Sequence, residues 1–232
     1  PLMCSSALSP LSFAQRVVAW QRQYGRQHLP WQGQDAYRVW LSEVMLQQTQ
    51  VATVLPYYQR FITTFPDVQT LAAAPLEQVL ALWSGLGYYA RARHLHQAAQ
   101  EVVNLWRGNF PSTVNELAQL SGVGRSTAAA IAAFAYGQRA AILDGNVKRV
   151  LARHDAVHGD TNHSAVLKQL WALAEAYLPS AKDIQPYTQG LMDLGSLVCT
   201  RTRPRCADCP VQASCQALQH GLTTQLPTPK TR

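Results

Sequence analysis

The sequence predicts an all-α fold, and three observations carry this prediction. Apolar residues recur at helical spacing along most of the 232 residues. No segment alternates polar and apolar side chains with the period of two that marks a strand. Proline, glycine and aspartate interrupt the apolar stretches at intervals that fit helix ends. A chain of this length can bury a substantial core and form one or two domains.

The same pattern gives the order of the expected helices. A first helix begins at Ser9-Pro10 and ends at Tyr24-Gly25. A short helix carries the apolar positions of 114–120, and another follows Asp144, which has the character of an N-cap. The remaining helices are expected over residues 36–46, 51–61, 71–83, 90–106, 128–136, 165–178 and 186–198.

Composition and charge limit the classes of function. Twenty Lys and Arg against thirteen Asp and Glu give a net charge of +7, which suits a polyanionic partner such as nucleic acid. The sequence has no run of eighteen apolar residues, and residues 1–6 lack the basic start and apolar core of an export signal. We therefore expect a soluble, cytoplasmic protein with no membrane association.

A glycine-rich turn joins two expected helices at 120–127. Gly122 and Gly124 flank one apolar residue, and an alanine-rich helical run starts directly afterwards. Such a turn points unpaired backbone N–H groups at an anion, and Arg125 adds a positive charge beside them. The turn is therefore either a phosphate-binding helix-hairpin-helix or a plain helix connector.

Two carboxylates stand out from their surroundings. Glu43 lies among apolar residues of the 36–46 helix, where it either reaches water at the helix edge or forms a polar stripe with Gln47 and Gln50 along a cleft. Burial in a cleft would raise its pKa and make it a general acid. Asp144 has a sufficient structural role as an N-cap, although a carboxylate fixed at a helix N-terminus also stays ionised and aimed.

The segment from Trp83 to Tyr89 combines two glycines with aromatic residues, and Arg91 and Arg93 follow it. Such a segment can press a side chain into a base stack while the cations bind phosphates. It can equally be a connector whose tyrosines pack in the core.

Four of the five cysteines lie within seventeen residues near the C-terminus, whereas Cys4 stands alone and is expected to be uninvolved. Clustering of this kind indicates a metal site in a reducing compartment rather than a disulfide framework. The spacing fits either a [4Fe-4S] cluster or a structural zinc ion. The ligands would be Cys199, Cys206, Cys209 and Cys215.

Four of these stretches together resemble the MutY family of adenine DNA glycosylases, within the endonuclease III superfamily. They are Leu41–Gln50, Gly85–Arg91, Gly122–Val147 and the four-cysteine tract, so the likeness covers roughly residues 10–218. The resemblance implies a six-helix barrel with the helix-hairpin-helix over 31–138 and a [4Fe-4S] domain from 1–30 and 139–218. Residues 219–232 would then be a tail or the start of a linker.

The resemblance also implies roles for individual residues. Glu43 would protonate adenine, Asp144 would stabilise the sugar cation or attack it, and Asn146 would orient Asp144. The family uses the [4Fe-4S] cluster for structure and DNA binding, and its substrate is double-stranded DNA containing adenine opposite 8-oxoguanine or guanine. The implied DNA contacts are Gln48, Thr49, Leu86, Tyr88, Gly122, Gly124, Arg125, Ser126, Lys148 and Gln189.

Residue 126 distinguishes relatives within the superfamily. Endonuclease III has a lysine at this position whose amine attacks the sugar, whereas Ser126 implies a monofunctional glycosylase. We also expect the protein to be a monomer. Two departures from the family are visible: the loop between Trp31 and Glu43 is one residue short, and this sequence ends at Arg232, where the family normally continues into a MutT-like domain. Removal of thymine or uracil, and damage binding without catalysis, are the alternative functions.

Overall fold

The structure is a computed structural model that describes residues 11–230. Every regular element in this part of the chain is a helix, so the predicted all-α fold class is confirmed. Cys4 and the expected helix start at Ser9-Pro10 lie outside the described residues. The first helix, α1, spans Phe13–Tyr24, and Ser12 caps it by accepting a hydrogen bond from the amide of Gln15.

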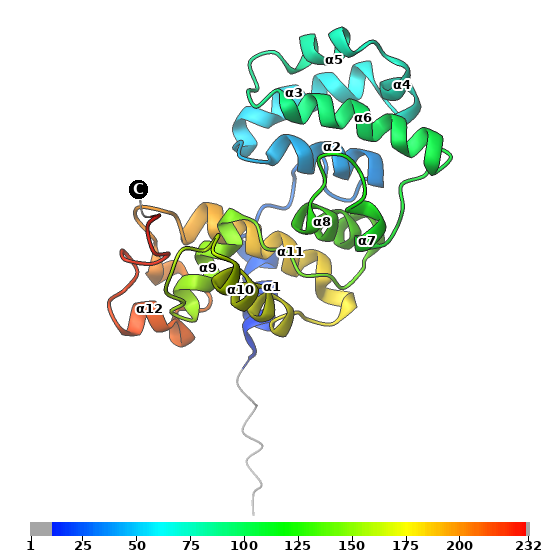
Figure 1. Ribbon diagram of the computed structural model, residues 1–232. Coiled ribbons are helices and arrows are strands. Elements are labelled where there is room, and N and C mark those ends of the chain that lie inside the picture. The colour runs from blue at the N-terminus through cyan, green and yellow to red at the C-terminus, as the bar shows by residue number, and fades with distance from the viewer. Residues whose placement is uncertain (1–10, 231–232) are drawn as a thin grey trace, which may run out of the picture.

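The helices fall into two groups, each with its own hydrophobic core (Figure 1). One group runs from α2 to α7, and the other contains α1 and the elements after α8. The bounds of the first group are α2 Ala36–Leu46, α3 Val51–Thr64, α4 Val68–Ala73, α5 Leu76–Trp83, α6 Ala90–Leu105 and α7 Val114–Leu117. Those of α8 and the second group are α8 Arg125–Tyr136, α9 Gly145–His154, α10 Ser164–Ala176, α11 Ile184–Asp193 and α12 Gln216–Gln219.

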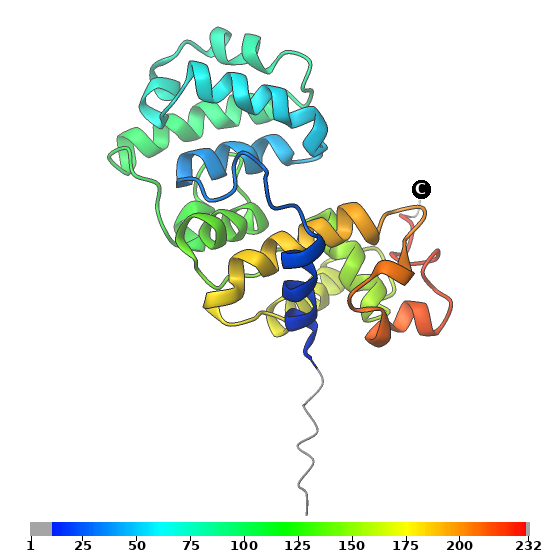
Figure 2. The ribbon, with the colours of Figure 1, turned by 180° about the vertical axis from the view of Figure 1, so that it is seen from behind.

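Helix α8 belongs to both cores because its small residues are buried on two sides. Ile131 and Ala132 pack with the first group, whereas Ala129, Ala130 and Ala133 pack with the second. Alanine lets neighbouring helices approach closely, so α8 contacts both α2 and α11. The view from behind shows α1, in blue, crossing α11, and the two helices are in contact although they are far apart in sequence (Figure 2).

One expected helix is two helices in the structure. The sequence predicted a single helix over 71–83, but α4 ends at Ala73 and α5 begins at Leu76. Pro75 has no amide proton to donate, and it disfavours the helical conformation of the residue before it. The proline therefore ends one helix and caps the next.

Two features near the C-terminus also differ from the simple pattern. The expected 186–198 helix continues past α11 as a π-helical turn over Leu194–Val198. The segment expected to be a tail packs against the protein, since Leu226 is buried and its carbonyl accepts a hydrogen bond of 2.8 Å from Arg153 Nε. Across residues 11–230, no helix is both long and apolar enough to span a bilayer.

Candidate active site between the two helix groups

Glu43 lies on α2 and lines a cavity of about 230 Å³ between the two helix groups. The other face of α2, including Trp40 and Leu41, is fully buried in the first core, so the helix cannot turn Glu43 away from the cavity. The opposite wall comes from α11, which contributes Pro186 and Gln189.

The pKa of Glu43 is raised to about 8, mainly by burial and in smaller part by the nearby charge of Asp144. Both effects disfavour the ionised form, the first by loss of solvation and the second by repulsion. Glu43 therefore carries a proton at neutral pH.

Asp144 is the N-cap of α9, and its Oδ1 accepts a hydrogen bond of 2.8 Å from the amide of Val147. Burial raises the pKa of this carboxyl. The backbone amides of Val147 and Asn146 and the charges of Arg149 and Lys148 act in the opposite direction. The anion of Asp144 thus has donors and cations that stabilise it.

The surroundings decide which of the two carboxyl groups holds the proton. Two close carboxylates do not both ionise readily in a buried site. The N-terminus of α9 and the charges of Arg149 and Lys148 stabilise the anion of Asp144, whereas both causes of the pKa shift of Glu43 destabilise its anion. These surroundings favour the proton on Glu43 over Asp144, which is the division that general acid catalysis with an anionic partner requires.

Asn146 makes its side-chain contact with Arg149, whose Nη2 donates to Asn146 Oδ1 at 2.9 Å. The Nε of the same arginine donates to the carbonyl of Cys199 at 2.8 Å. The side chain of Asn146 is therefore linked to the cysteine segment through Arg149. Toward Asp144, Asn146 offers its backbone amide, which donates a hydrogen bond to that carboxyl.

Gln189 points into the cavity from α11 and is held by a residue that the sequence analysis missed. Its Nε2 donates to Asp193 Oδ1 at 2.9 Å, and the same oxygen accepts from Arg26 Nε at 2.6 Å. Asp193 is completely buried, so it fixes the side-chain amide of Gln189 in one direction. The spacing of four residues on one helix was the available signal.

The four DNA contacts expected in the loops after α2 and α5 do not all face solvent. Gln48 and Tyr88 are exposed, and both have a positive φ, of 56° and 50° respectively. Thr49 is partly exposed, with its hydroxyl accepting from Arg91 Nη2 at 3.0 Å. Leu86 differs, because its side chain is only 5% exposed and belongs to the first core.

The polar stripe predicted for Glu43, Gln47 and Gln50 is wrong. Helix α2 ends at Leu46, so Gln47 is its C-cap and Gln50 is the N-cap of α3. Gln47 Nε2 donates instead to the carbonyl of Gly122 at 3.2 Å. This residue joins α2 to the glycine turn.

The two glycines of the turn have different reasons for being glycine. Gly122 has φ of +76°, and a Cβ there would lie 2.8 Å from His94 Cβ. Gly124 has an ordinary backbone conformation and open space where a Cβ would be. The space in front of the α8 N-terminus is therefore free for a ligand to approach.

The next two residues of the hairpin are engaged within the protein. Arg125 Nη2 pairs with Glu175 of α10 at 2.9 Å, and its guanidinium lies 3.7 Å from the ring centroid of Trp171. Ser126 Oγ accepts a hydrogen bond of 2.9 Å from the amide of Leu143. Both residues connect the hairpin to the second helix group.

Lys148, on α9, is close enough to Asp144 for its charge to lower the pKa of that carboxyl against the effect of burial. Its Nζ donates to Asn162 Oδ1 at 3.1 Å. The amine is thus held on the same helix end as the candidate catalytic carboxylate.

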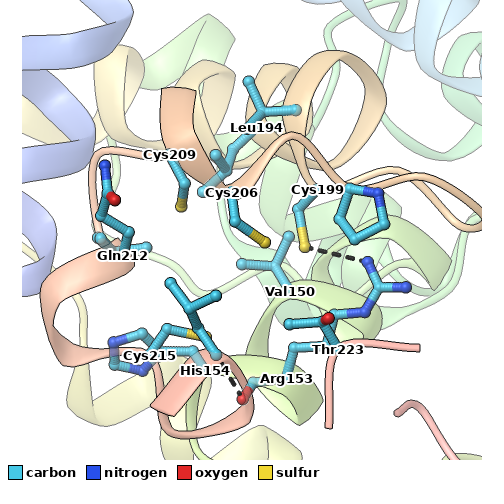
Figure 3. Close-up of a pocket in the computed structure, with 14 residues that line it drawn as sticks. Val150, Arg153, His154, Leu194, Cys199, Cys206, Cys209, Gln212, Cys215 and Thr223 are labelled. Carbon is cyan, nitrogen blue, oxygen red and sulfur yellow. Dashed lines mark hydrogen bonds between the residues drawn. The ribbon is translucent and has the colours of Figure 1, made fainter. Parts of the chain in front are cut away.

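The four cysteines line one cavity in the second helix group (Figure 3). All four are free thiols and partly buried, and the lining also includes apolar side chains such as Val150 and Leu194 and polar ones such as His154 and Gln212. Arg153 Nη1 lies 3.4 Å from the sulfur of Cys199. Within the described part of the chain, no three Cys, His, Asp or Glu side chains converge closely enough to hold a single metal ion.

Residues 41–176, more than half of the chain, match the HhH-GPD superfamily of base excision DNA repair proteins. The chain belongs to this superfamily. The adenine DNA glycosylase of Buchnera aphidicola subsp. Baizongia pistaciae is 41% identical over 211 residues, which cover 90% of this chain and 59% of that protein. The human adenine DNA glycosylase is 44% identical over 225 residues, covering 93% and 41% respectively.

Solved structures agree with the HhH-GPD assignment. A thermostable thymine-DNA glycosylase superposes with a TM-score of 0.79 at 27% identity, covering 90% of this chain and 95% of its own. An endonuclease III trapped as a covalent intermediate with DNA gives a TM-score of 0.75 at 21% identity, with coverage of 90% and 95%. The likeness to endonuclease III shows the predicted fold. The chain spans about three fifths of the Buchnera protein and about two fifths of the human protein.

Proposed function

We propose that this HhH-GPD protein is a monofunctional adenine DNA glycosylase, which removes adenine paired with 8-oxoguanine or guanine in double-stranded DNA. The observation that carries the proposal is the pairing of Glu43, whose pKa burial raises to about 8, with the helix-capping Asp144. The adenine DNA glycosylases among its relatives support the choice of base. The enzyme would act as a monomer on DNA in the cytoplasm.

The chemistry divides between the two carboxyl groups as in a retaining glycosidase. Glu43 donates its proton to a ring nitrogen of the extruded adenine, which makes the base a neutral leaving group as the bond to the sugar breaks. Asp144 stabilises the positive charge that develops on the sugar, or attacks it to give a covalent intermediate that water then resolves. The side-chain amide of Gln189 lines the same cavity and would contact the base.

Extrusion of the adenine costs a few kcal/mol of stacking and pairing, which contacts with DNA must offset. The exposed side chains of Gln48 and Tyr88 would fill the space in the duplex, with Thr49 and the backbone at Leu86 facing the partner base. The open N-terminus of α8 at Gly124 would take a phosphate. Lys148 and the residues of the hairpin would complete the DNA contacts.

We propose that Cys199, Cys206, Cys209 and Cys215 hold a [4Fe-4S] cluster. Four thiolates around a cavity fit a cluster of several atoms, whereas a zinc ion needs four sulfurs about 2.3 Å from one point. When bound, the cluster supplies structural and electrostatic support for DNA binding. We further propose residues 31–138 as the barrel domain and 1–30 with 139–218 as the cluster domain.

Base release across a matrix of pairs tests the proposed function. Duplexes with labelled adenine, thymine or uracil opposite 8-oxoguanine, guanine or cytosine are incubated with protein and then treated with hot alkali. The proposal requires alkali-dependent cutting at adenine opposite 8-oxoguanine and guanine. Release of thymine instead would favour the activity named for the thymine-DNA glycosylase neighbour. Binding without any release would favour a damage binder.

A further inference from the structure

Arg91 is a buried cation to which the proposed chemistry gives no role. It lies in the first turn of α6, and only 8% of the residue is exposed. No carboxylate among the described residues forms an ion pair with it. The groups that accept hydrogen bonds from its Nη1 and Nη2 are all neutral and come from two separate loops, whereas its Nε is buried without a partner among the described residues.

The first loop is the connection between α2 and α3. Arg91 Nη1 donates to the carbonyl of Met45 at 2.6 Å and to that of Gln47 at 2.7 Å, with Val44 O at 3.1 Å. These carbonyls belong to the C-terminal end of α2, where helical carbonyls lack partners and a cation is favoured. Arg91 Nη2 adds the contact with Thr49 Oγ1 at 3.0 Å.

The second loop is the connection between α5 and α6. The same Nη2 donates to the carbonyl of Gly87 at 3.1 Å. The guanidinium also lies over two aromatic rings, with centroid distances of 5.1 Å to Trp83 and 5.5 Å to Tyr88. One planar group therefore spans both loops.

The two loops share an unusual backbone feature at the residues that are exposed. Gln48 and Tyr88 both have a positive φ. Such conformations are costly for residues other than glycine, and they persist where the surroundings determine them. In each case the preceding carbonyl, that of Gln47 or that of Gly87, accepts a hydrogen bond from Arg91.

We propose that Arg91 is a positioning residue that holds Gln48 and Tyr88 at a fixed separation, so that both enter the duplex together when the base is extruded. This inference rests on the proposed function, because it assigns the two side chains to DNA. Arg91 itself touches neither the base nor the sugar. Its fork of donors orients the two peptide groups that precede the wedge residues.

The variant Arg91→Lys tests this role because it keeps the charge and removes the fork. An ammonium has three donors on one atom, and this compact group cannot span both loops as the planar guanidinium does. In the free protein we expect hydrogen exchange at 47–49 and at 86–89 to accelerate together, by about tenfold or more for the loss of charge-assisted hydrogen bonds. Exchange in α11 is expected to stay unchanged. The matched control is Arg60→Lys, an exposed arginine of α3 that stacks on Tyr57.

The activity readout separates positioning from chemistry. In single-turnover reactions, Arg91→Lys should remove adenine opposite 8-oxoguanine about tenfold or more slowly from a fully paired duplex. The loss should shrink to about twofold when the flanking pairs are mismatched, because unstacking then costs less. Arg60→Lys should match the unsubstituted protein on both duplexes. Equal losses on the two duplexes would overturn the proposal, as would faster exchange in only one loop.

Failure of the proposed function would look different. An unsubstituted protein that releases no base refutes the glycosylase proposal, while the exchange data still decide whether Arg91 couples the loops. If Arg91→Lys does not fold, Thr49→Val gives the same test with the guanidinium in place. Faster exchange at 86–89 after this change in the other loop supports the coupling, and an effect confined to 47–49 overturns it.

Discussion

Glu43→Gln should strongly slow base release and stabilise the protein at alkaline pH. The glutamine keeps the shape of a neutral glutamic acid but cannot donate a catalytic proton, so the excision rate should fall by about 10²–10⁴-fold. The folded pKa of about 8 lies above the ordinary 4.5. The folded state therefore binds the proton more tightly, and Glu43 costs stability as pH rises from 4.5 through 8.

The size of this stability effect follows from the pKa difference. A rise of about 3.5 in pKa, at 1.36 kcal/mol for each pKa unit, corresponds to a cost of about 5 kcal/mol once Glu43 is ionised. Urea unfolding of the DNA-free protein should thus show an advantage of Glu43→Gln over the unsubstituted protein that grows by about 3 kcal/mol between pH 6 and pH 9.

The control for this experiment is Glu77→Gln, which changes an exposed glutamate in the first turn of α5. Its stability relative to the unsubstituted protein should not change across the same pH range. If the advantage of Glu43→Gln were constant with pH, the carboxyl of Glu43 would not be the neutral acid that the proposed mechanism needs.

Three further predictions test the carboxylate pair, the hairpin and the metal site. Asp144→Asn should remove repulsion from Glu43 and lower its folded pKa, so the fall in stability that begins near pH 4.5 should end at a lower pH than about 8. An unchanged pH dependence of urea unfolding would contradict this. Gly122→Ala should lower the free energy of unfolding by about 1–3 kcal/mol because residue 122 has a positive φ. Gly124→Ala should leave this free energy unchanged and weaken binding to a DNA duplex in a titration. Equal effects of the two changes on stability would refute the distinction. The purified protein should be yellow-brown with iron bound, and Cys199→Ser should lower both iron content and thermal stability; a colourless protein with one zinc ion per chain would exclude the cluster.

Local sequence features predicted much of the fold. The bounds expected for α2, 36–46, are those of the structure, because Asp35 caps it and an apolar face continues to Leu46. Asp144 is the predicted N-cap of α9. The prediction of a single helix over 71–83 was wrong because it followed the apolar spacing and neglected Pro75, which separates α4 from α5.

The parts that escaped prediction depend on contacts between distant segments. Glu43 and Asp144 are 101 positions apart, and only the resemblance to a known family placed them together before the structure did. The contact between Asp193 and Gln189 left only the four-residue spacing of two polar residues on one helix, and the contacts of Arg91 with two loops left no local pattern. Leu86 was predicted as a DNA contact, yet apolar spacing could not tell a wedge from a core residue, and its side chain is buried.

The protonation state of Glu43 is the claim on which the mechanism depends most, and it can be measured directly. Protein labelled with 13C at the glutamate carboxyl carbons is titrated by NMR, and Glu43→Gln identifies the signal that disappears. The account predicts that this signal titrates with a midpoint near pH 8. A midpoint near the ordinary value of 4.5 would contradict it, because Glu43 would then be ionised at neutral pH and could not protonate a base.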